Sequence, residues 1–317
     1  MIYTVTFNPA IDCVMKVEDL ALGSVNRALT QEFYYGGKGV NVSYVLSHLG
    51  RTSTAWGFVA GWTGEALEAA LREDGIATEF VHLPQGNTRV NMKLKGTAAG
   101  SGEDVETAVN AGGAPIDDDS LKRFFRQLED VGKGDFVILS GGIPKGTPDD
   151  IYARIMEKLG GRGSNVVVDA TEDILMQSLP FQPFLVKPND EELADITGCD
   201  PLDESALEDG ARMLQSKGAR NVLVSRGGLG SMLLDETGRL QSAPVIKGTL
   251  VNSVGAGDST VAGFVEGYLR GVEAGADGVA VYDEAYKLAQ ACGSATAFSP
   301  GLAPIGLVNE LLERLES

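Results

Sequence analysis

Short runs of apolar, β-branched residues alternate along this chain with longer stretches in which apolar positions recur every three or four residues. The first pattern predicts strands buried on both faces, and the second predicts amphipathic helices that pack against them. The clearest strands are expected at residues 5–7, 136–139, 166–168, 185–186 and 222–224, and the clearest helices at 121–128, 151–159, 206–214 and 284–297. This alternation predicts an α/β fold with a doubly wound, mostly parallel sheet.

Two segments, 12–35 and 88–110, depart from this alternation. Polar and apolar residues alternate in both with almost no helical period, which is typical of a small sheet with one solvated face. Such a sheet could close over a substrate as a lid, or it could extend the main sheet, and the pattern leaves both open. Because no linker rich in Pro, Gly or Ser divides the chain, residues 1–317 are expected to form a single domain.

The charge balance limits the kinds of partner that this chain can bind. Asp and Glu number 44 against 26 Lys and Arg, a net charge of -18, so nucleic acid and anionic membranes are not expected partners. The three cysteines, Cys13, Cys199 and Cys292, are too far apart for a zinc motif and predict no disulfide framework. The chain opens with a strand-like run, and no apolar run is long enough to span a membrane, so we expect a cytosolic protein.

Residues 252–259, Asn-Ser-Val-Gly-Ala-Gly-Asp-Ser, are the strongest candidate for chemistry. Glycines in the turn let backbone amides face a ligand, and the following helical pattern supplies free, partially positive N–H groups. Together they predict an anion site that suits a phosphate. Asp258 lies beside this site and could accept a proton from an attacking hydroxyl. The alternative is that Asp258 only caps the helix.

Two other segments suggest binding sites at helix starts. Residues 36–41, Gly-Gly-Lys-Gly-Val-Asn, predict an anion or polyol site, although they lack the spacing of a Walker A loop and could form only a tight turn. Asn189 and Glu192, three residues apart, predict a capping box, and Glu192 could also hold Mg²⁺ through water. Asp12 follows the first strand and could bind sugar hydroxyls or simply serve the turn.

Residues 36–41 resemble the first signature, and residues 252–259 the second, of the ribokinase-like (pfkB) carbohydrate kinases. The resemblance extends from Thr4 to about Leu302. Its finer details are similar to the branch of 1-phosphofructokinase and tagatose-6-phosphate kinase, at residues 6–12, 23–27, 88–91, 139–146, 187–189 and 293–299. The chain departs from the familiar pattern at Arg226, where this family more often has a smaller or apolar residue.

The resemblance implies a ribokinase-like fold and an ATP-dependent kinase of a phosphorylated ketohexose. Fructose 1-phosphate, converted to fructose 1,6-bisphosphate, is the first expected substrate, and tagatose 6-phosphate is the second. A kinase of an unphosphorylated sugar or nucleoside is a further alternative, and a non-catalytic sugar or nucleotide sensor is an alternative from another class. The resemblance implies ATP and Mg²⁺ as cofactors and allows K⁺ as a further one. It also implies a homodimer that forms through the lid.

The resemblance also implies a role for individual residues. Asp258 would be the catalytic base, and the amides of Gly255, Ala256 and Gly257 would form the anion hole. For the substrate, the expected ligands are Asp12, Gly37 and Asn41 at the hydroxyls, Lys38 and Arg89 at the phosphate, and Arg27 from a partner's lid. For ATP they are Lys187, Asn189, Ser225, Gly228 and Gly230, with Glu192 near Mg²⁺.

Overall fold

A computed structural model describes residues 1–98, 104–170 and 172–316 of the chain. Its centre is a nine-stranded sheet in which seven neighbouring strands run parallel. In spatial order these are β5 (Ala77–Leu83), β4 (Thr54–Ala60), β1 (Ile2–Thr6), β8 (Phe136–Ser140), β9 (Asn165–Asp169), β10 (Leu185–Val186) and β11 (Asn221–Ser225). The antiparallel strands β12 (Ser231–Leu234) and β13 (Leu240–Ala243) complete one edge. The predicted α/β fold with a mostly parallel sheet is thus confirmed.

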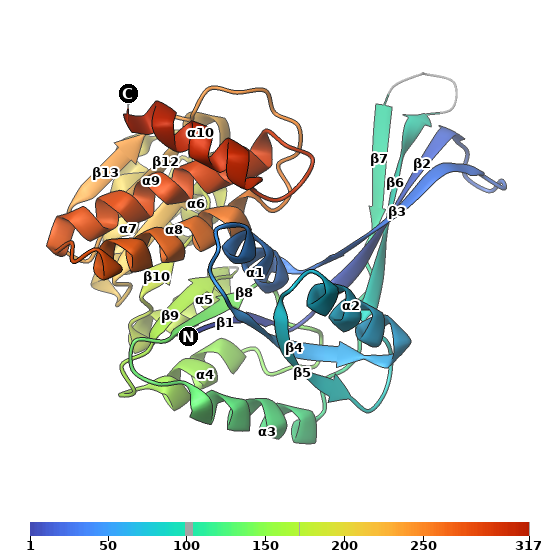
Figure 1. Ribbon diagram of the computed structural model, residues 1–317, viewed down its shortest axis with the longest axis horizontal. Coiled ribbons are helices and arrows are strands. Elements are labelled where there is room, and N and C mark those ends of the chain that lie inside the picture. Colours follow the sequence, from blue (N-terminus) through green and yellow to red (C-terminus); the bar gives the residue numbers. More distant parts are fainter. Residues whose placement is uncertain (99–103, 171, 317) are drawn as a thin grey trace.

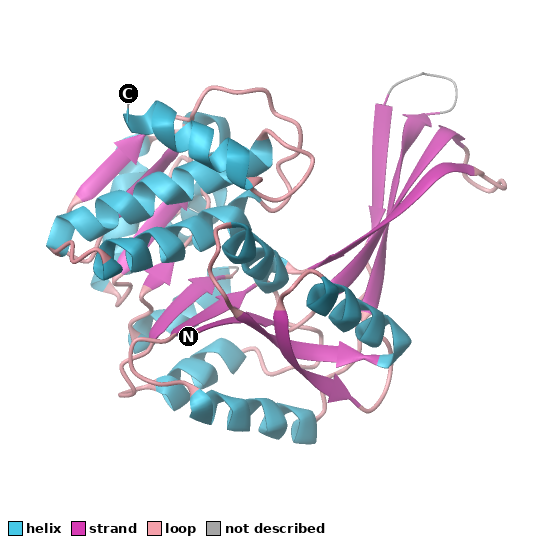
Figure 2. Ribbon diagram, in the orientation of Figure 1, coloured by secondary structure: helices cyan, strands magenta, loops and turns pink. Residues whose placement is uncertain are grey.

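Helices cover both faces of this sheet (Figure 1, Figure 2). One face packs against α3 (Asp118–Gln127), α4 (Ile151–Leu159), α5 (Glu172–Ser178), α6 (Asp190–Thr197) and α7 (Glu204–Ser216). The other packs against α1 (Lys38–His48), α2 (Gly61–Glu73), α8 (Ala256–Glu273), α9 (Gly278–Ala297) and α10 (Ile305–Glu316). Because both faces are covered, the central strands are wholly buried and read as continuous apolar runs, as in Val166, Val167 and Val168.

A separate four-stranded sheet projects from the side of this body (Figure 1). Its order is β3 (Ala28–Gly36), β2 (Ala10–Leu20), β6 (Arg89–Ala98) and β7 (Asp104–Val109). The outer pairs are antiparallel, whereas β2 and β6 run parallel, with Asp12 opposite Asn91. Strands β6 and β7 lie within the predicted segment 88–110, whereas β2 begins two residues before the predicted segment 12–35 and β3 ends one residue after it. Residues 99–103 of the second segment lie outside the described residues.

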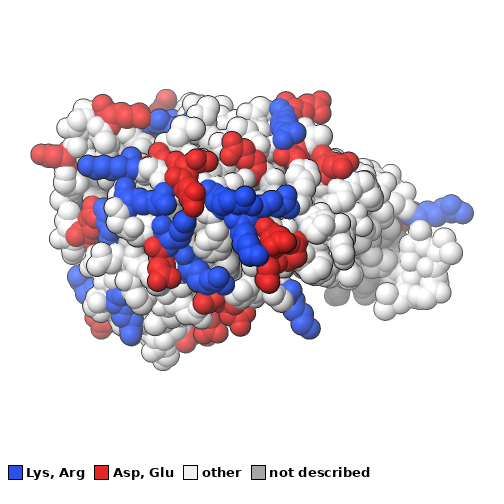
Figure 3. Space-filling model, turned by 90° about the horizontal axis from the view of Figure 1, so that it is seen from below, with Lys and Arg blue, Asp and Glu red and all other residues white. Residues whose placement is uncertain are grey.

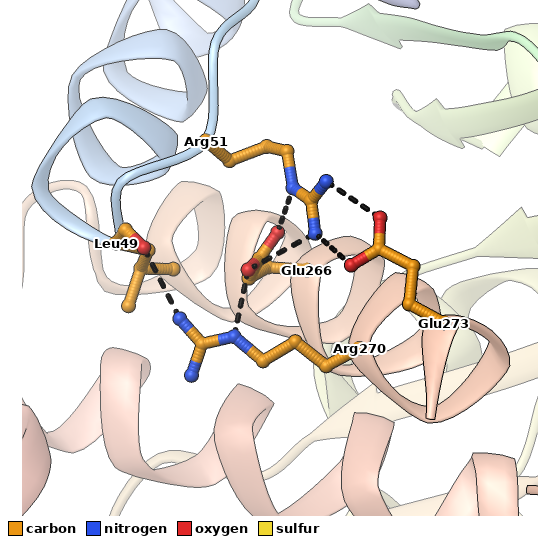
Figure 4. Close-up of polar contacts among 5 residues, drawn as sticks. All are labelled: Leu49, Arg51, Glu266, Arg270 and Glu273. Atoms are coloured by element: carbon orange, nitrogen blue, oxygen red, sulfur yellow. Dashed lines mark hydrogen bonds and ion pairs between the residues drawn. The ribbon is translucent and has the colours of Figure 1, made fainter. Parts of the chain in front are cut away.

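Helices α1 and α8 lie against each other and are joined at their far ends by a charged cluster (Figure 4). The buried carboxylate of Glu266 accepts from Nε of Arg51 at 2.6 Å and from Nε of Arg270 at 2.7 Å. Arg51 also binds Glu273, and Arg270 donates to the carbonyl oxygen of Leu49 at 3.1 Å. The cluster connects the segment after α1 to the C-terminal half of α8, beside the buried apolar side chains that the two helices share.

Charged side chains of both signs share the molecular surface. On the face seen from below, Lys and Arg side chains lie beside Asp and Glu rather than forming a uniformly basic stripe (Figure 3). Among the helices of the described residues, we find none that is long and apolar enough to cross a bilayer.

Candidate active site

The first turn of α8 forms an open anion site. Gly255 precedes the helix with a left-handed φ of 82°, and a Cβ at this position would overlap the side chain of Leu302. In the described part of the chain, the amides of Gly255 and Gly257 have no hydrogen-bond acceptor, while the amide of Ala256 donates to Ser253 at 3.3 Å. A Cβ on Gly257 would lie 3.3 Å from Nζ of Lys187, so the turn faces a buried cation. Free amides and an ammonium group together suit a phosphoryl group.

Asp258 lies at the edge of this turn with only 5% of its surface exposed. Its Oδ2 accepts a hydrogen bond of 2.8 Å from Nδ2 of Asn41, in the first turn of α1. Burial and then the charge of Asp169 raise the pKa of Asp258 to about 6, against the opposing effects of Asn41, Lys38 and Lys187. A carboxylate with this pKa is mostly ionised at neutral pH and still basic enough to accept a proton.

Asp169, the last residue of β9, lies between two ammonium groups. Lys187 Nζ is 3.3 Å from its Oδ1, and Lys38 Nζ is 3.4 Å from its Oδ2. Burial would raise the pKa of Asp169, but the two lysines outweigh it and the pKa is lowered. For Lys38, burial would lower the pKa, and the carboxylates of Asp169, Asp258 and Glu192 raise it overall. The sequence pattern predicts Asp169 at the carboxyl end of a buried parallel strand, where ligands bind in such sheets, but it assigns this residue no specific role.

The glycines that begin α1 allow it to approach β1 closely. Gly37 has φ 135°, and a Cβ there would lie 2.7 Å from Cγ2 of Thr6. A Cβ on Gly39 would lie 2.6 Å from Oγ1 of Thr6, the atom that accepts from the Val40 amide. Only glycine therefore fits at these two positions, and this close contact brings Lys38 and Asn41 to the strand ends.

The predicted capping box at α6 is present. The side chain of Asn189 accepts from the Glu192 amide at 2.6 Å, and that of Glu192 accepts from the Asn189 amide at 2.8 Å. The described residues contain no group of three or more acidic, His or Cys side chains able to hold a metal. The cap engages Oε2 of Glu192, and the other carboxylate oxygen suits the kind of Mg²⁺ site that uses one or two carboxylates with water.

A glycine-rich loop follows β11 next to this helix. Ser225 forms an isolated bridge with Asn189, which joins the two loops. Gly230 has φ 103°, and a Cβ there would overlap the carbonyl oxygen of Ala243, whereas Gly228 has open space where a Cβ would be. Arg226 is buried and its Nη1 lies 3.0 Å from Oε2 of Glu204. The unexpected arginine thus has a structural partner at the start of α7.

The base of the small sheet carries a second polar cluster. Asp12 accepts from Nδ2 of Asn91 at 2.8 Å, and its Oδ2 lies 3.0 Å from Nζ of Lys93. Burial lowers the pKa of Arg89, and the charge of Asp12 opposes this shift. The Nε of Arg89 has no hydrogen-bond partner among the described residues. Sequence reasoning singled out Asp12 and Arg89 but missed the role of Asn91 and Lys93 beside them.

The two cations expected at a substrate phosphate have different neighbours in this structure. Lys38 lies beside Asp169 near the start of α8, whereas the charged group that acts on Arg89 is Asp12. Arg27 is exposed in the loop between β2 and β3, at the far end of the small sheet.

Comparisons with known proteins agree with this geometry. Residues 3–306 match the family described as pfkB family carbohydrate kinase. The chain is 39% identical over its whole length, and over 99% of the relative, to a 1-phosphofructokinase of Bacillus subtilis. It is 32% identical, again over 100% and 99% of the two chains, to a D-tagatose-1-phosphate kinase of Bacillus licheniformis. The structure of Escherichia coli phosphofructokinase-2 with fructose-6-phosphate covers 100% of this chain and 99% of its own, with a TM-score of 0.87 at 24% identity, and so shares the fold.

Proposed function

This chain belongs to the pfkB family of carbohydrate kinases, and on that premise we propose that it phosphorylates fructose 1-phosphate to fructose 1,6-bisphosphate with ATP. It is a phosphotransferase with an alcohol acceptor. The observation that carries the proposal of catalysis is the buried Asp258, with a pKa of about 6, at the open first turn of α8, where the charges of Lys38 and Lys187 act on it. The choice of fructose 1-phosphate rests on the 1-phosphofructokinase relative. A sensor without catalysis would need no such base.

Asp258 is the residue that we assign to the acceptor hydroxyl. Its carboxylate takes the hydroxyl proton as the oxygen attacks the transferring phosphoryl group. The free amides of Gly255 and Gly257 hold the charge that develops on that group, because they are fixed in place before the reaction begins. The Ala256 amide joins them by giving up its 3.3 Å bond to Ser253. Asn41 orients the carboxylate through its 2.8 Å hydrogen bond.

The nucleotide side is assigned to residues around the ends of β10 and β11: Lys187, Asn189, Ser225, Gly228 and Gly230. The closeness of Lys187 to Gly257 supports a role at the ATP phosphates. Mg²⁺, when bound, neutralises charge on those phosphates, and Glu192 is the side chain that we assign to it. The family resemblance allows K⁺ as a further cofactor, so kinase activity is measured with and without K⁺.

The sugar side is assigned to Asp12, Gly37 and Asn41 for the hydroxyls, with Arg89 and Lys38 for the phosphate. The buried, unpartnered Nε of Arg89 supports the assignment to an anion. We treat residues 1–317 as one kinase domain, with the small sheet as its lid over the bound sugar. We also place the protein in the cytosol, where sugar phosphates and ATP are available.

The relatives suggest a second substrate. The D-tagatose-1-phosphate kinase relative is named for a ketohexose phosphorylated on C1, as fructose 1-phosphate is. We therefore add tagatose 1-phosphate to tagatose 6-phosphate as alternatives. A coupled ADP-release assay with these three sugar phosphates, fructose 6-phosphate and free fructose tests the proposal. A highest kcat/KM for free fructose, or no ADP release with any of them, would contradict it.

A homodimer through the lid is the oligomeric state that we propose. Strand β3 is exposed along most of its length, with Phe33 and Tyr34 on opposite faces at 53% and 52% exposure. Leu22 and Val25 in the adjoining loop are 94% and 89% exposed. A second copy would cover this apolar surface, and Arg27 in the same loop could then reach the partner's site. Sedimentation of the wild type against a Phe33→Lys variant tests the dimer, which the variant should dissociate.

A further inference from the structure

Two side chains of β6, Asn91 and Lys93, contact Asp12. Residues two apart on a strand share a face, so Arg89, Asn91 and Lys93 lie on one side of the small sheet. Asp12 is directly opposite Asn91 in the register, and both of its oxygens are engaged, by Nδ2 of Asn91 and Nζ of Lys93. The side chains of Asp12 and Lys93 are 27% and 21% exposed, so the cluster is partly open to solvent.

The charges in this cluster do not cancel. Asp12 supplies one negative charge, while Arg89 and Lys93 supply two positive charges within its reach. Glu32 on β3, opposite Val14, lies on the same face, and its Oε2 accepts from the hydroxyl of Tyr34. Among the side chains of β2 and β6 beside Asp12, one positive charge is left, in a protein whose net charge is -18. Lys38 does not share this cluster, because its ammonium group is paired with Asp169 at 3.4 Å. An anion that binds beside Asp12 would find Arg89 and Lys93 as its cations.

We propose that Lys93 is a substrate-binding residue that, together with Arg89, contacts the phosphate group of the bound ketohexose phosphate. This inference rests on the proposed function. The ammonium group has three donors, so it can keep its contact with Asp12 and still donate to a phosphate oxygen. Asp12 is then held in place for a sugar hydroxyl by the same lysine.

Lys95 provides a matched control. It lies two residues further along the same face of β6, is 54% exposed and pairs with Glu106 on β7, 3.3 Å away. Binding of fructose 1-phosphate is measured by titration calorimetry for the wild type, Lys93→Met and Lys95→Met. We expect Lys93→Met to weaken binding by roughly 10- to 100-fold, the loss of a charge-assisted hydrogen bond. Lys95→Met should bind as the wild type does, and affinity for ATP should be unchanged in both variants.

A role through Asp12 alone would give a different result. If Lys93 only positions Asp12, adding Lys93→Met to Asp12→Asn should not weaken the binding of fructose 1-phosphate further. If Lys93 contacts the phosphate, the double variant should bind fructose 1-phosphate about 10-fold or more weakly than Asp12→Asn does. Lys93→Arg should retain most of the affinity. Should Lys93→Met lower the thermal unfolding midpoint, Lys93→Gln, whose amide can still bond to Asp12, takes its place.

Binding and turnover separate this inference from the proposed function. If the wild type binds a ketohexose phosphate in a Lys93-dependent way but releases no ADP, the proposed function fails and the role of Lys93 stands. Four results would each overturn the role of Lys93. Lys93→Met could bind with wild-type affinity, or Lys93→Met and Lys95→Met could lose equal affinity. The double variant could show no extra loss, or the wild type could bind no ketohexose phosphate.

Discussion

The side-chain amide of Asn41 donates a 2.8 Å hydrogen bond to the carboxylate of Asp258, although the two residues are 217 positions apart in the chain. Each lies in the first turn of a helix, and the two helices are fastened together at their far ends by Glu266 and its arginines. The candidate base is therefore oriented by one helix and carried by another.

Asp258→Asn should reduce kcat by about 10²- to 10⁴-fold, the usual contribution of a positioned general base. The amide has nearly the same shape and can still accept a bond from Asn41, so ATP binding should survive. Steady-state kinetics and nucleotide titration check the two parts. A purified variant with kcat within a few-fold of the wild type would rule out the assignment.

The same substitution should stabilise the fold at neutral pH. Folding raises the pKa of Asp258 from 3.8 to about 6, so the folded state disfavours the ionised side chain. This cost is absent below pH 3.8, where the group is protonated in both states, develops as the pH rises, and is complete above pH 6. At about pH 8 Asp258→Asn should therefore gain on the order of 1–3 kcal/mol in the free energy of unfolding. Thermal melts at several pH values would show the gain disappearing in acid; a constant gain would contradict the explanation.

Asn41→Leu should move the acid limb of the pH profile to higher pH. Activity requires ionised Asp258, so kcat/KM should rise with pH through a value near 6 in the wild type. The hydrogen bond from Asn41 lowers that pKa, and its removal should raise it. Profiles between about pH 5 and 9 test this. A limb that stays in place or moves toward acid would show that Asn41 does not act on Asp258.

Arg89→Ala and Lys38→Ala should have different effects because the two cations have different neighbours. Arg89→Ala should lower kcat/KM for the sugar phosphate by about 10- to 100-fold, mainly through KM. Lys38→Ala should also lower kcat and raise the pKa of Asp258, since the Lys38 charge holds that pKa down. Kinetics with each substrate varied in turn separate these outcomes. Wild-type kinetics in both variants would remove both residues from the sugar site.

Glu266→Gln should destabilise the fold by about 1–3 kcal/mol, because a buried carboxylate that binds two arginines is lost. Glu273→Gln is the matched control: it removes an exposed carboxylate that binds the same Arg51, and should destabilise the fold much less than Glu266→Gln does. Denaturant unfolding measures both. Equal losses in the two variants would indicate that burial of Glu266 carries no special weight.

Local patterns in the sequence were enough to predict much of the structure. The apolar runs at 166–168 and 222–224 became central strands, and the pattern at 151–159 matched α4 residue for residue. The turn at Gly255 and the capping box of Asn189 and Glu192 were also predicted, because each depends on contacts only a few residues apart. Periodicity and capping are short-range effects, and a single sequence displays them directly.

Only the tertiary structure decided which distant side chains meet. Asp169 lies between Lys38 and Lys187 because β9 and β10 end, and α1 begins, at the same edge of the sheet, and Lys38 is 131 positions from Asp169. Lys93 meets Asp12 because β2 and β6 pair in parallel, an arrangement that alternating residues in each strand do not specify. The sequence determined the elements and the types of residue at their ends. The packing of those elements, through contacts between segments far apart in the chain, determined the charges that surround Asp258, and with them its pKa.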